Sequence, residues 1–114
     1  MTLAGSSFRA VANSINGTLN KNTTMTFVSE DEWGILGVYG GGTIRTGSVV
    51  ARRRDPSAIE MLYHYVTTSG ELKAGRAMAS FSHNSDKRLC MHLDWQWLTG
   101  DRSEGASEWI LEAS

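Results

Sequence analysis

Two histidines and a nearby aspartate are the residues whose types could perform acid–base chemistry. His64 lies between Tyr63 and Tyr65, and His92 is followed two residues later by Asp94. Imidazole titrates near neutral pH and a carboxylate can orient it, so this set could move a proton on a bound substrate. A serine nucleophile is not indicated, because the strained turn that presents it in hydrolases is missing. We predict no catalytic residue, and we keep a barrel enzyme of the isomerase, cyclase or lyase type, with a His or Tyr acid–base group, as the alternative function.

Aromatic side chains that carry polar atoms form a second set, and their chemistry is binding. Phenol hydroxyls and indole N–H groups give directional contacts to a partly apolar molecule. The aromatic residues predicted to bind a ligand are Tyr39, Tyr63, Tyr65, Trp95 and Trp97. Such residues are also common core material, so the sequence leaves open whether they line a cavity or fill the interior.

Two arginines are predicted at the polar end of this ligand site, inside the fold or at its mouth. Arg45 lies between hairpin glycines, and Arg76 is flanked by Ala74 and Met78 on its face of a strand. A buried guanidinium needs a carboxylate, which either the protein or a ligand supplies. The candidates within the chain are Glu71, Asp94 and Asp101. If none of them pairs with the arginines, an anionic ligand is expected.

Metal and cofactor sites are not predicted. The single cysteine, Cys90, and the three histidines show none of the paired spacings that hold a structural zinc. The glycine-rich segment 40–47 could suit a phosphate, but coenzyme A needs a helix N-terminus after such a turn, and no helical pattern follows. We interpret this segment as a β-hairpin, which argues against an acyltransferase.

Charge and composition exclude several classes of partner. The 114 residues include 11 Lys and Arg against 12 Asp and Glu, and the basic run Arg52, Arg53 and Arg54 would alternate between the two faces of a strand. A continuous positive face for nucleic acid is therefore not predicted. The chain shows no signal-peptide pattern, and no apolar run approaches the roughly 18 residues that span a bilayer. We expect a cytoplasmic protein with no nucleic-acid or membrane partner.

Short strands must position all of these groups. Turn-forming clusters punctuate the chain, and the segments between them are rich in branched and aromatic residues that suit a pleated sheet. No segment of ten or more residues shows the apolar spacing of a helix. The predicted strands are 8–13, 23–30, 33–39, 47–54, 61–68, 72–82, 88–98 and 107–112.

The segment 88–98 has the clearest period of two. The members of its apolar face are Leu89, Met91, Leu93, Trp95 and Trp97. We predict that Trp95 and Trp97 point into the fold and that Gln96 points out, because a register shift of one residue would bury Asp94 and His92 instead.

Eight consecutive strands with short connections can form a meander that closes on itself and leaves no exposed edge. We predict an all-β chain with one domain, residues 1–114, folded as a single eight-stranded antiparallel up-and-down β-barrel. A β-sandwich is the alternative, although this chain has little room for the longer connections between its sheets.

The stretch WQWLTGDRSEGAS at 95–107 resembles the signature of a family of small bacterial proteins of about this length. The resemblance extends to GTIRTG at 42–47, YHY at 63–65 and GEL at 70–72. Members often carry the label of an N-acetylglutamate synthase, but their structural analogy is to avidin-like, calycin-type barrels. The segment WLTG at 97–100 followed by Trp109 is also similar to avidins, although Ile110 stands where avidins usually have Lys, so biotin binding is not carried over.

The resemblance implies an avidin- or lipocalin-like barrel that holds a ligand in its interior. Together with the aromatic set, it favours a non-catalytic protein that binds a small, partly apolar molecule, with a carboxylate as an option. Two strands also carry apolar groups on both faces, among them Leu62, Val66 and Ile110. Outward apolar patches usually mark an interface, so we expect a homo-oligomer, most simply a two-fold dimer.

Overall fold

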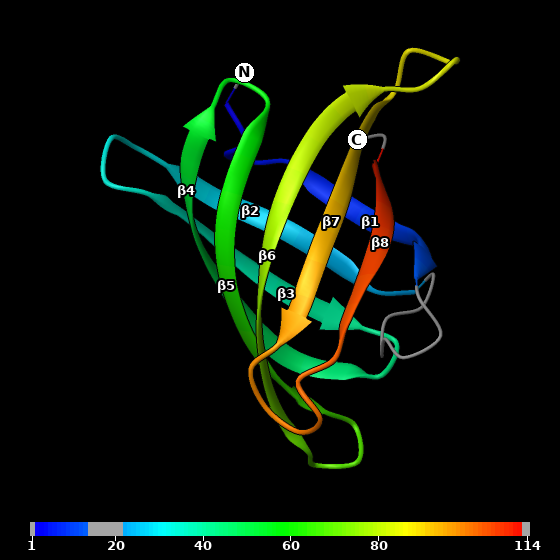
Figure 1. Ribbon diagram of the computed structural model, residues 1–114. Helices are drawn as coiled ribbons and strands as arrows, with labels where there is room; N and C mark the ends of the chain where they lie inside the picture. The colour runs from blue at the N-terminus through cyan, green and yellow to red at the C-terminus, as the bar shows by residue number, and fades with distance from the viewer. Residues whose placement is uncertain (1, 14–21, 113–114) are drawn as a thin grey trace.

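The strands close into a barrel. The computed structural model describes residues 2–13 and 22–112, which form eight antiparallel strands, each paired with its neighbours in sequence (Figure 1). The strands are β1 Ser7–Asn13, β2 Thr24–Glu30, β3 Ile35–Gly41, β4 Ile44–Asp55, β5 Ala58–Thr67, β6 Leu72–His83, β7 Leu89–Trp97 and β8 Glu104–Leu111. Pairing of β1 with β8 completes the closure. The predicted all-β, up-and-down barrel is confirmed; among the described residues there is no helix, and hence none that could span a membrane.

All eight predicted strands are present, with their ends shifted by a few residues. The largest shifts lengthen strands at hairpins: β4 begins at Ile44 rather than 47, and β5 begins at Ala58 rather than 61. Gly41 and Gly42 have φ angles of 90° and 62°. Because glycine adopts positive φ without steric cost, the chain reverses within a tight turn and pairs again at once.

Alternate residues of each strand point into the barrel. In β7, Met91, Leu93, Trp95 and Trp97 are buried, whereas Gln96 is partly exposed on the outer wall. The predicted orientation of Trp95, Trp97 and Gln96 is therefore confirmed. The β5 strand follows the same rule, with inward residues Ile59, Met61, Tyr63, Tyr65 and Thr67.

The segment before β1 seals one end of the barrel. Leu3 is 0% exposed, and the N–H of Gly5 donates to the carbonyl oxygen of Phe27 at 2.8 Å. The ring of Phe8 lies 5.9 Å from those of both Phe27 and Phe81. This end is thus a packed apolar core.

An ion pair lies beside this sealed end. Arg53 donates from Nε to Oε2 of Glu30 at 2.7 Å and from Nη2 to Oε1 at 2.8 Å, and the N–H of Leu3 also donates to Oε1 at 2.8 Å. The two side chains are mostly buried. The hydrogen bond from Arg53 lowers the pKa of Glu30; burial opposes the shift, and the bond from Leu3 adds to it.

Glu30→Gln should therefore destabilise the fold in a pH-dependent way. A carboxyl whose pKa is lower in the folded state stabilises the fold above its unfolded pKa of about 4.3, and that stability is lost as pH falls through the folded value. We expect Glu30→Gln to cost about 1.5 to 3 kcal/mol near pH 7 and progressively less below about pH 4. Urea unfolding of both proteins over this range measures the difference, with Glu112→Gln, at an exposed position, as control. A difference that stays constant with pH would contradict the assignment.

Candidate functional site

Three tyrosines stack inside the barrel near the end opposite Leu3. Tyr39 comes from β3, and Tyr63 and Tyr65 come from β5. The ring of Tyr39 lies 5.9 Å from that of Tyr63 and 5.6 Å from that of Tyr65, and all three rings are inclined by 30° or less to one another. Alternation along two strands that flank β4 brings these residues together.

Tryptophans from β7 and β8 extend this aromatic cluster. The rings of Trp95 and Trp97 are 5.4 Å apart, and Trp97 meets Tyr63 edge-on at 6.4 Å and an interplanar angle of 70°. Trp109 meets Tyr39 edge-on at 5.8 Å. The five aromatic residues predicted from the sequence therefore lie together in the interior; whether they bind a ligand stays a prediction.

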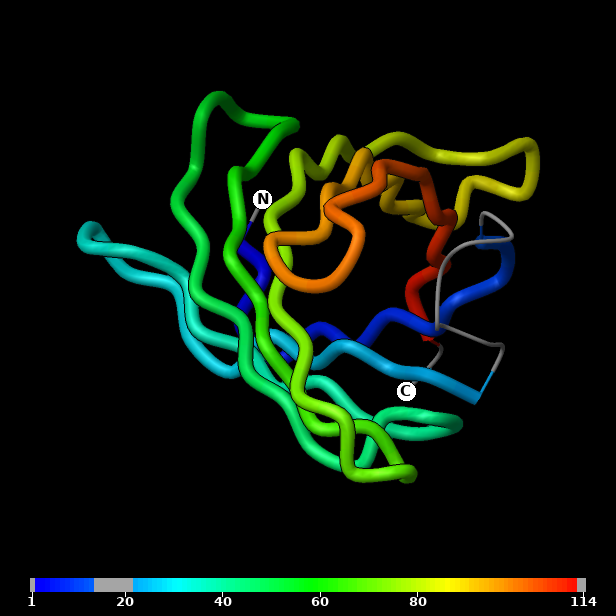
Figure 2. The backbone as a smooth tube through the Cα atoms, turned by 60° about the horizontal axis from the view of Figure 1, so that its bottom comes forward, coloured from blue at the N-terminus to red at the C-terminus, as the bar shows by residue number. Residues whose placement is uncertain are grey.

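All of the interior aromatic side chains are buried, and their residual exposure does not separate the two ends. Phe8 and Phe27 are 0% exposed and Phe81 keeps 8%, whereas Tyr65 keeps 1%, Tyr63 and Trp95 each keep 5% and Trp97 keeps 6%. The β7–β8 connection, residues 98–103, curls beside this second end (Figure 2). Trp97, which keeps 6% exposure, lies at this second end, which we call the open end.

The indole N–H of Trp95 is a buried donor without a protein acceptor. Its Nε1 has no hydrogen-bond partner among the described residues, although solvent does not reach the atom. The deeper Trp109, by contrast, donates from Nε1 to Oγ of Ser107 at 2.9 Å. A buried polar atom without a partner is costly, so an acceptor supplied from outside the chain would be favourable there.

The hydroxyls of Tyr39 and Tyr63 stay protonated near neutral pH. Burial raises the pKa of Tyr39 well above its ordinary value, and the neighbouring Tyr63 and Tyr65 raise it further. Burial likewise raises the pKa of Tyr63. Phenols in this state are suited to hydrogen bonding with a ligand and poorly suited to act as a general base.

Two glycines make room for the tyrosines. A Cβ on Gly75 would lie 2.4 Å from the hydroxyl oxygen of Tyr63, and a Cβ on Gly47 would lie 2.6 Å from Cβ of Tyr65. Sequence reasoning missed their role in the site. Their positions across from inward tyrosines in neighbouring strands are the signal, but this signal is visible only once the register is known.

Arg76 is not inside the barrel, contrary to prediction. Odd-numbered residues of β6 face inward, so Arg76 is exposed on the outer wall, where Nε and Nη2 donate to Oε1 of Gln96 at 3.2 and 3.0 Å. The prediction was wrong because the inward residues Gly75, Ala77 and Ala79 are small, which left the inner face of this strand hard to distinguish from the outer one.

Arg45 is also exposed, for a different reason. The pairing of β4 with β5 shifts between Ile44 and Thr46, so Arg45 occupies an irregularity in the ladder. Ile44 takes the inward position and is buried, while Arg45 points to solvent close to the open end. Of the two places predicted for Arg45, inside the barrel or at its mouth, the first is wrong, and Arg45 lies at the rim.

Lys73 is the cation that faces the interior at the open end. It precedes Gly75 on the inner face of β6, and its side chain is only 20% exposed. Its Nζ lies 4.6 Å from the ring centroid of Trp97 and 3.8 Å from Oε1 of Glu71. Lys73 thus occupies the place that the sequence analysis gave to Arg76, a cation beside the aromatic cluster.

A sequence profile of avidin-like proteins matches residues 1–111, nearly the whole chain. The chain belongs to the avidin-like protein family. The closed eight-stranded barrel agrees with this assignment, and the resemblance stated from the sequence is confirmed. The comparisons with curated proteins and with solved structures gave no match.

The histidines lie outside this avidin-like barrel. His64 is exposed on the outer wall of β5. On β7, Nε2 of His92 contacts Oδ1 of Asp94 at 3.0 Å, and Nδ1 contacts Oε1 of Glu108. The hydrogen bond to Glu108, followed by that to Asp94, raises the pKa of His92 against the effect of burial. The structure does not bring His64 and His92 together at the aromatic cluster.

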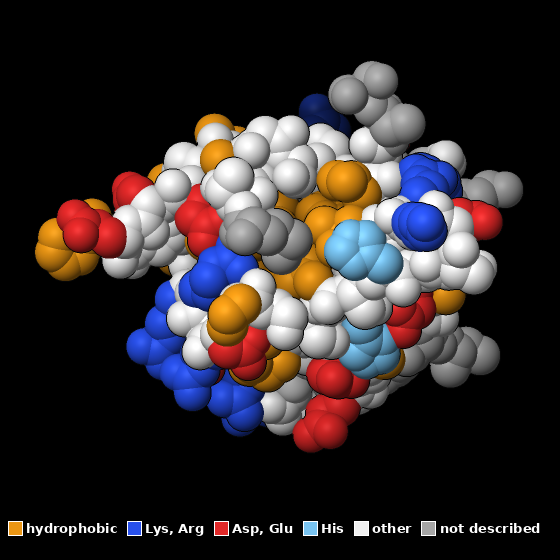
Figure 3. Space-filling model, turned by 90° about the horizontal axis from the view of Figure 1, so that it is seen from above, with side chains coloured by type: hydrophobic (Ala, Val, Ile, Leu, Met, Phe, Trp, Pro, Cys, Tyr) orange, Lys and Arg blue, Asp and Glu red, His pale blue; other side chains and the backbone are white. Residues whose placement is uncertain are grey.

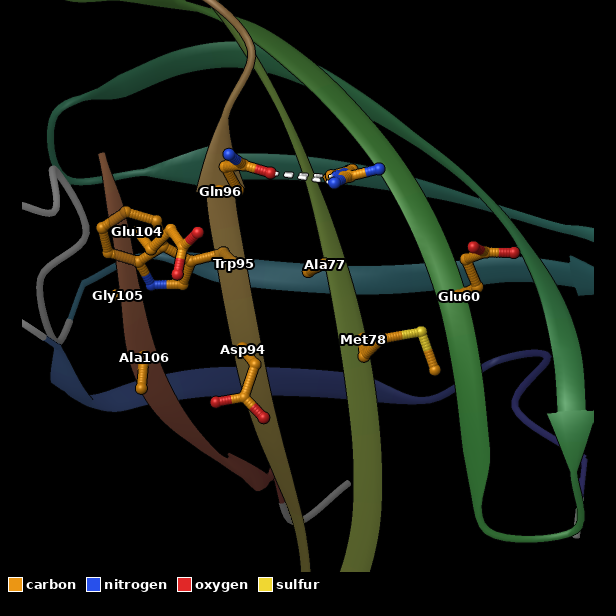
Figure 4. A pocket seen from close by; sticks show the side chains of 10 residues that line it. Glu60, Ala77, Met78, Asp94, Trp95, Gln96, Glu104, Gly105 and Ala106 are labelled. Carbon is orange, nitrogen blue, oxygen red and sulfur yellow. Dashed lines mark hydrogen bonds between the residues drawn. The ribbon is translucent and has the colours of Figure 1, made fainter. Parts of the chain in front are cut away.

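The outer wall of the avidin-like barrel carries a groove of about 690 Å³ across β5, β6, β7 and β8 (Figure 4). Its lining residues are Glu60, Arg76, Ala77, Met78, Asp94, Trp95, Gln96, Glu104, Gly105 and Ala106. Within the described part of the chain, no group of three or more His, Cys, Asp or Glu is placed to hold a metal ion. The groove was not anticipated, because it depends on which outward side chains the register sets side by side.

Proposed function

We propose that this avidin-like protein is a non-catalytic binding barrel for a small, partly apolar molecule that carries an anionic hydrogen-bond acceptor. The observation that carries the proposal is the buried N–H of Trp95, which has no acceptor among the described residues and adjoins Trp97. An acceptor on a ligand would satisfy this donor, and the aromatic faces at the open end would contact the apolar part.

The charge of the open end supports an anionic group on the ligand. Lys73 lies over Trp97, and Arg45 lies at the rim. The Nζ of Lys73 also lies 3.8 Å from the exposed carboxylate of Glu71, so a ligand carboxylate would compete with Glu71 for this cation. A carboxylate near Lys73 would gain a charge-assisted contact in a partly buried setting. The alternative, a barrel enzyme, has less support, because His64 and His92 lie on the outer wall and burial raises the pKa of Tyr39 and of Tyr63.

A thermal-shift screen tests the proposal with a panel of small aromatic and aliphatic carboxylates, each paired with its neutral amide. A ligand that binds only the folded state raises the melting temperature. Replacing Lys73 with methionine should weaken binding of the carboxylates and leave the amides unaffected. A panel in which no member stabilises the protein would contradict the proposal.

Trp95→Phe should weaken binding of any panel member that binds by about five- to tenfold, the worth of one hydrogen bond. The variant keeps an aromatic ring and removes the unpartnered donor. Trp109→Phe is the matched control, since it makes the same change at a residue whose N–H already bonds to Ser107. Isothermal titration at a temperature where both variants are folded compares them. Equal losses of affinity in the two variants would exclude Trp95 as the ligand's donor.

A further inference from the structure

The outer wall of β3, β4 and β5 carries a stripe of exposed aliphatic side chains. Leu36 on β3 pairs with Val50 on β4, and Val50 pairs in turn with Leu62 on β5, so these three residues form one row across adjacent strands. Val38 lies two residues along from Leu36 on the same face, and Val28 lies at the irregularity where β2 pairs with β3. All five side chains are between 50 and 59% exposed. We call these five residues the aliphatic stripe.

The stripe is apolar where other parts of the outer wall are charged. The outward side chains of β7 and β8 include Asp94, Glu104 and Glu108, all exposed. Figure 3 shows Lys and Arg side chains gathered at the lower left and acidic side chains at the bottom. Single hydrophobic residues are common on protein surfaces, but five that adjoin one another through the strand register form a contiguous patch. Such a patch usually marks an interaction surface.

The shape and symmetry of the stripe fit a second copy of this chain. The stripe lies on the face of a sheet, and sheet faces pack on one another about 10 Å apart with interdigitated side chains. Val50 lies in the middle of the row, with Leu36 on one side and Leu62 on the other. A two-fold axis along this row sets each of these side chains against the same residue of the partner, as in an isologous interface.

The polar residues that border the row also match across this axis. Ser48 pairs with His64 on one side of the row, and Arg52 pairs with Glu60 on the other side. The two-fold rotation exchanges these sides, so Arg52 meets the partner's Ser48 and Glu60 meets the partner's His64. Within each copy, Nε of Arg52 also contacts Oε1 of Glu60 at 2.8 Å. The axis therefore brings neutral or complementary groups together beside the aliphatic centre.

Arg76 continues the row on β6 but does not oppose this contact. Its Nε and Nη2 donate to Oε1 of Gln96 on β7, the strand on the far side from Leu62. The wall of a closed barrel also curves away on both sides of a contact centred on β4. The charge at the end of the row is thus directed away from the partner.

We propose that a second copy of this chain packs on the aliphatic stripe, so that the protein forms a two-fold dimer through the outer walls of β3, β4 and β5. The sequence analysis expects a dimer from Leu62, Val66 and Ile110. This proposal retains Leu62, whereas Val66 and Ile110 are only partly exposed and Ile110 lies on β8, away from the stripe. It does not depend on the ligand at the open end.

Sedimentation equilibrium of the full chain, from about 1 to 200 µM, tests the proposal. We expect the mass of the wild type to rise from 12.5 kDa towards twice that value. Val50→Asp should weaken dimerisation about thirtyfold or more, because it places a charge at the centre of the interface. Leu62→Ser tests the same surface without a new charge and should weaken dimerisation about tenfold.

Val11→Asp is the matched control for Val50→Asp. Val11 is 50% exposed on β1, outside the stripe, so the same change there should leave dimerisation unchanged. Circular dichroism of each variant verifies that the barrel is folded. A wild type that stays monomeric at about 200 µM would overturn the proposal. So would a dimer that both Val50→Asp and Leu62→Ser leave intact, or one that Val11→Asp weakens as much as Val50→Asp.

Cross-linking locates the contact independently of these affinities. In a Cys90→Ser background, which removes the single native cysteine, Val50→Cys places a thiol near the two-fold axis. A short bis-maleimide should then link two copies covalently, whereas Val11→Cys should give no linked dimer. Linked dimers from Val11→Cys but not from Val50→Cys would overturn the proposal and assign the interface to another wall of the barrel.

Discussion

Trp109→Ala should lower the free energy of unfolding by about 3 to 5 kcal/mol, the range measured for large aromatic residues removed from protein cores. Trp109 is the largest fully buried side chain of the barrel. Its ring meets Tyr39 edge-on, and its Nε1 bonds to Ser107. Alanine would leave a cavity between the sealed end and the aromatic cluster, together with a hydroxyl that has lost its donor.

Urea unfolding followed by circular dichroism measures this loss. Trp33→Ala removes the same side chain from an 86% exposed position, so in dilute solution its effect should stay within about 0.5 kcal/mol. A loss below about 1 kcal/mol for Trp109→Ala would show that the interior is not packed as the structure describes.

Gly47→Ala should cost about 3 kcal/mol, the upper part of the usual range for overpacking. The new Cβ would lie 2.6 Å from Cβ of Tyr65, 2.8 Å from the carbonyl oxygen of His64 and 3.1 Å from Cβ of Tyr39. None of these atoms is the far end of a flexible side chain, so the strands themselves must separate. The change should also disturb the tyrosine stack.

Gly40→Ala provides the control for this substitution. Gly40 also lies in a strand, but a Cβ there would meet nothing within 4 Å. Its melting temperature should match or exceed that of the wild type, because alanine restricts the unfolded chain more than glycine does. Equal effects of the two substitutions would mean that the contacts around Gly47 do not limit the fold.

The order and number of strands could be predicted from the sequence, because turn residues and branched residues alternate regularly along the chain. In β7 the inward face was also predictable, since Met91, Leu93 and Trp95 contrast sharply with His92 and Asp94. Burying an imidazole and a carboxylate in their place would be costly, so only one register is compatible with the fold.

The positions of the charged residues around the site could not be predicted from the sequence, because local features of β4 and β6 determine which side chains face the interior. The inner face of β6 is built from Gly75, Ala77 and Ala79, while Arg76 and Met78 on the outer face look equally suited to an interior. In β4, an irregularity in the ladder moves Arg45 outward. Further along β4, Arg53 is the arginine that turns toward the core, where Glu30 neutralises it. Bulges and the size of small residues decide these cases, and neither has a clear sequence period.

Closure of the barrel by β1 and β8 also has a consequence for how the chain reaches its native state. Every other pairing joins strands that are adjacent in sequence, whereas Phe8 pairs with Leu111 across nearly the full length of the chain. During synthesis, successive hairpins can assemble as they leave the ribosome, but β1 keeps one bare edge until the last strand emerges. The slow step should therefore be this long-range closure, and the nascent chain is most prone to aggregate just before it occurs.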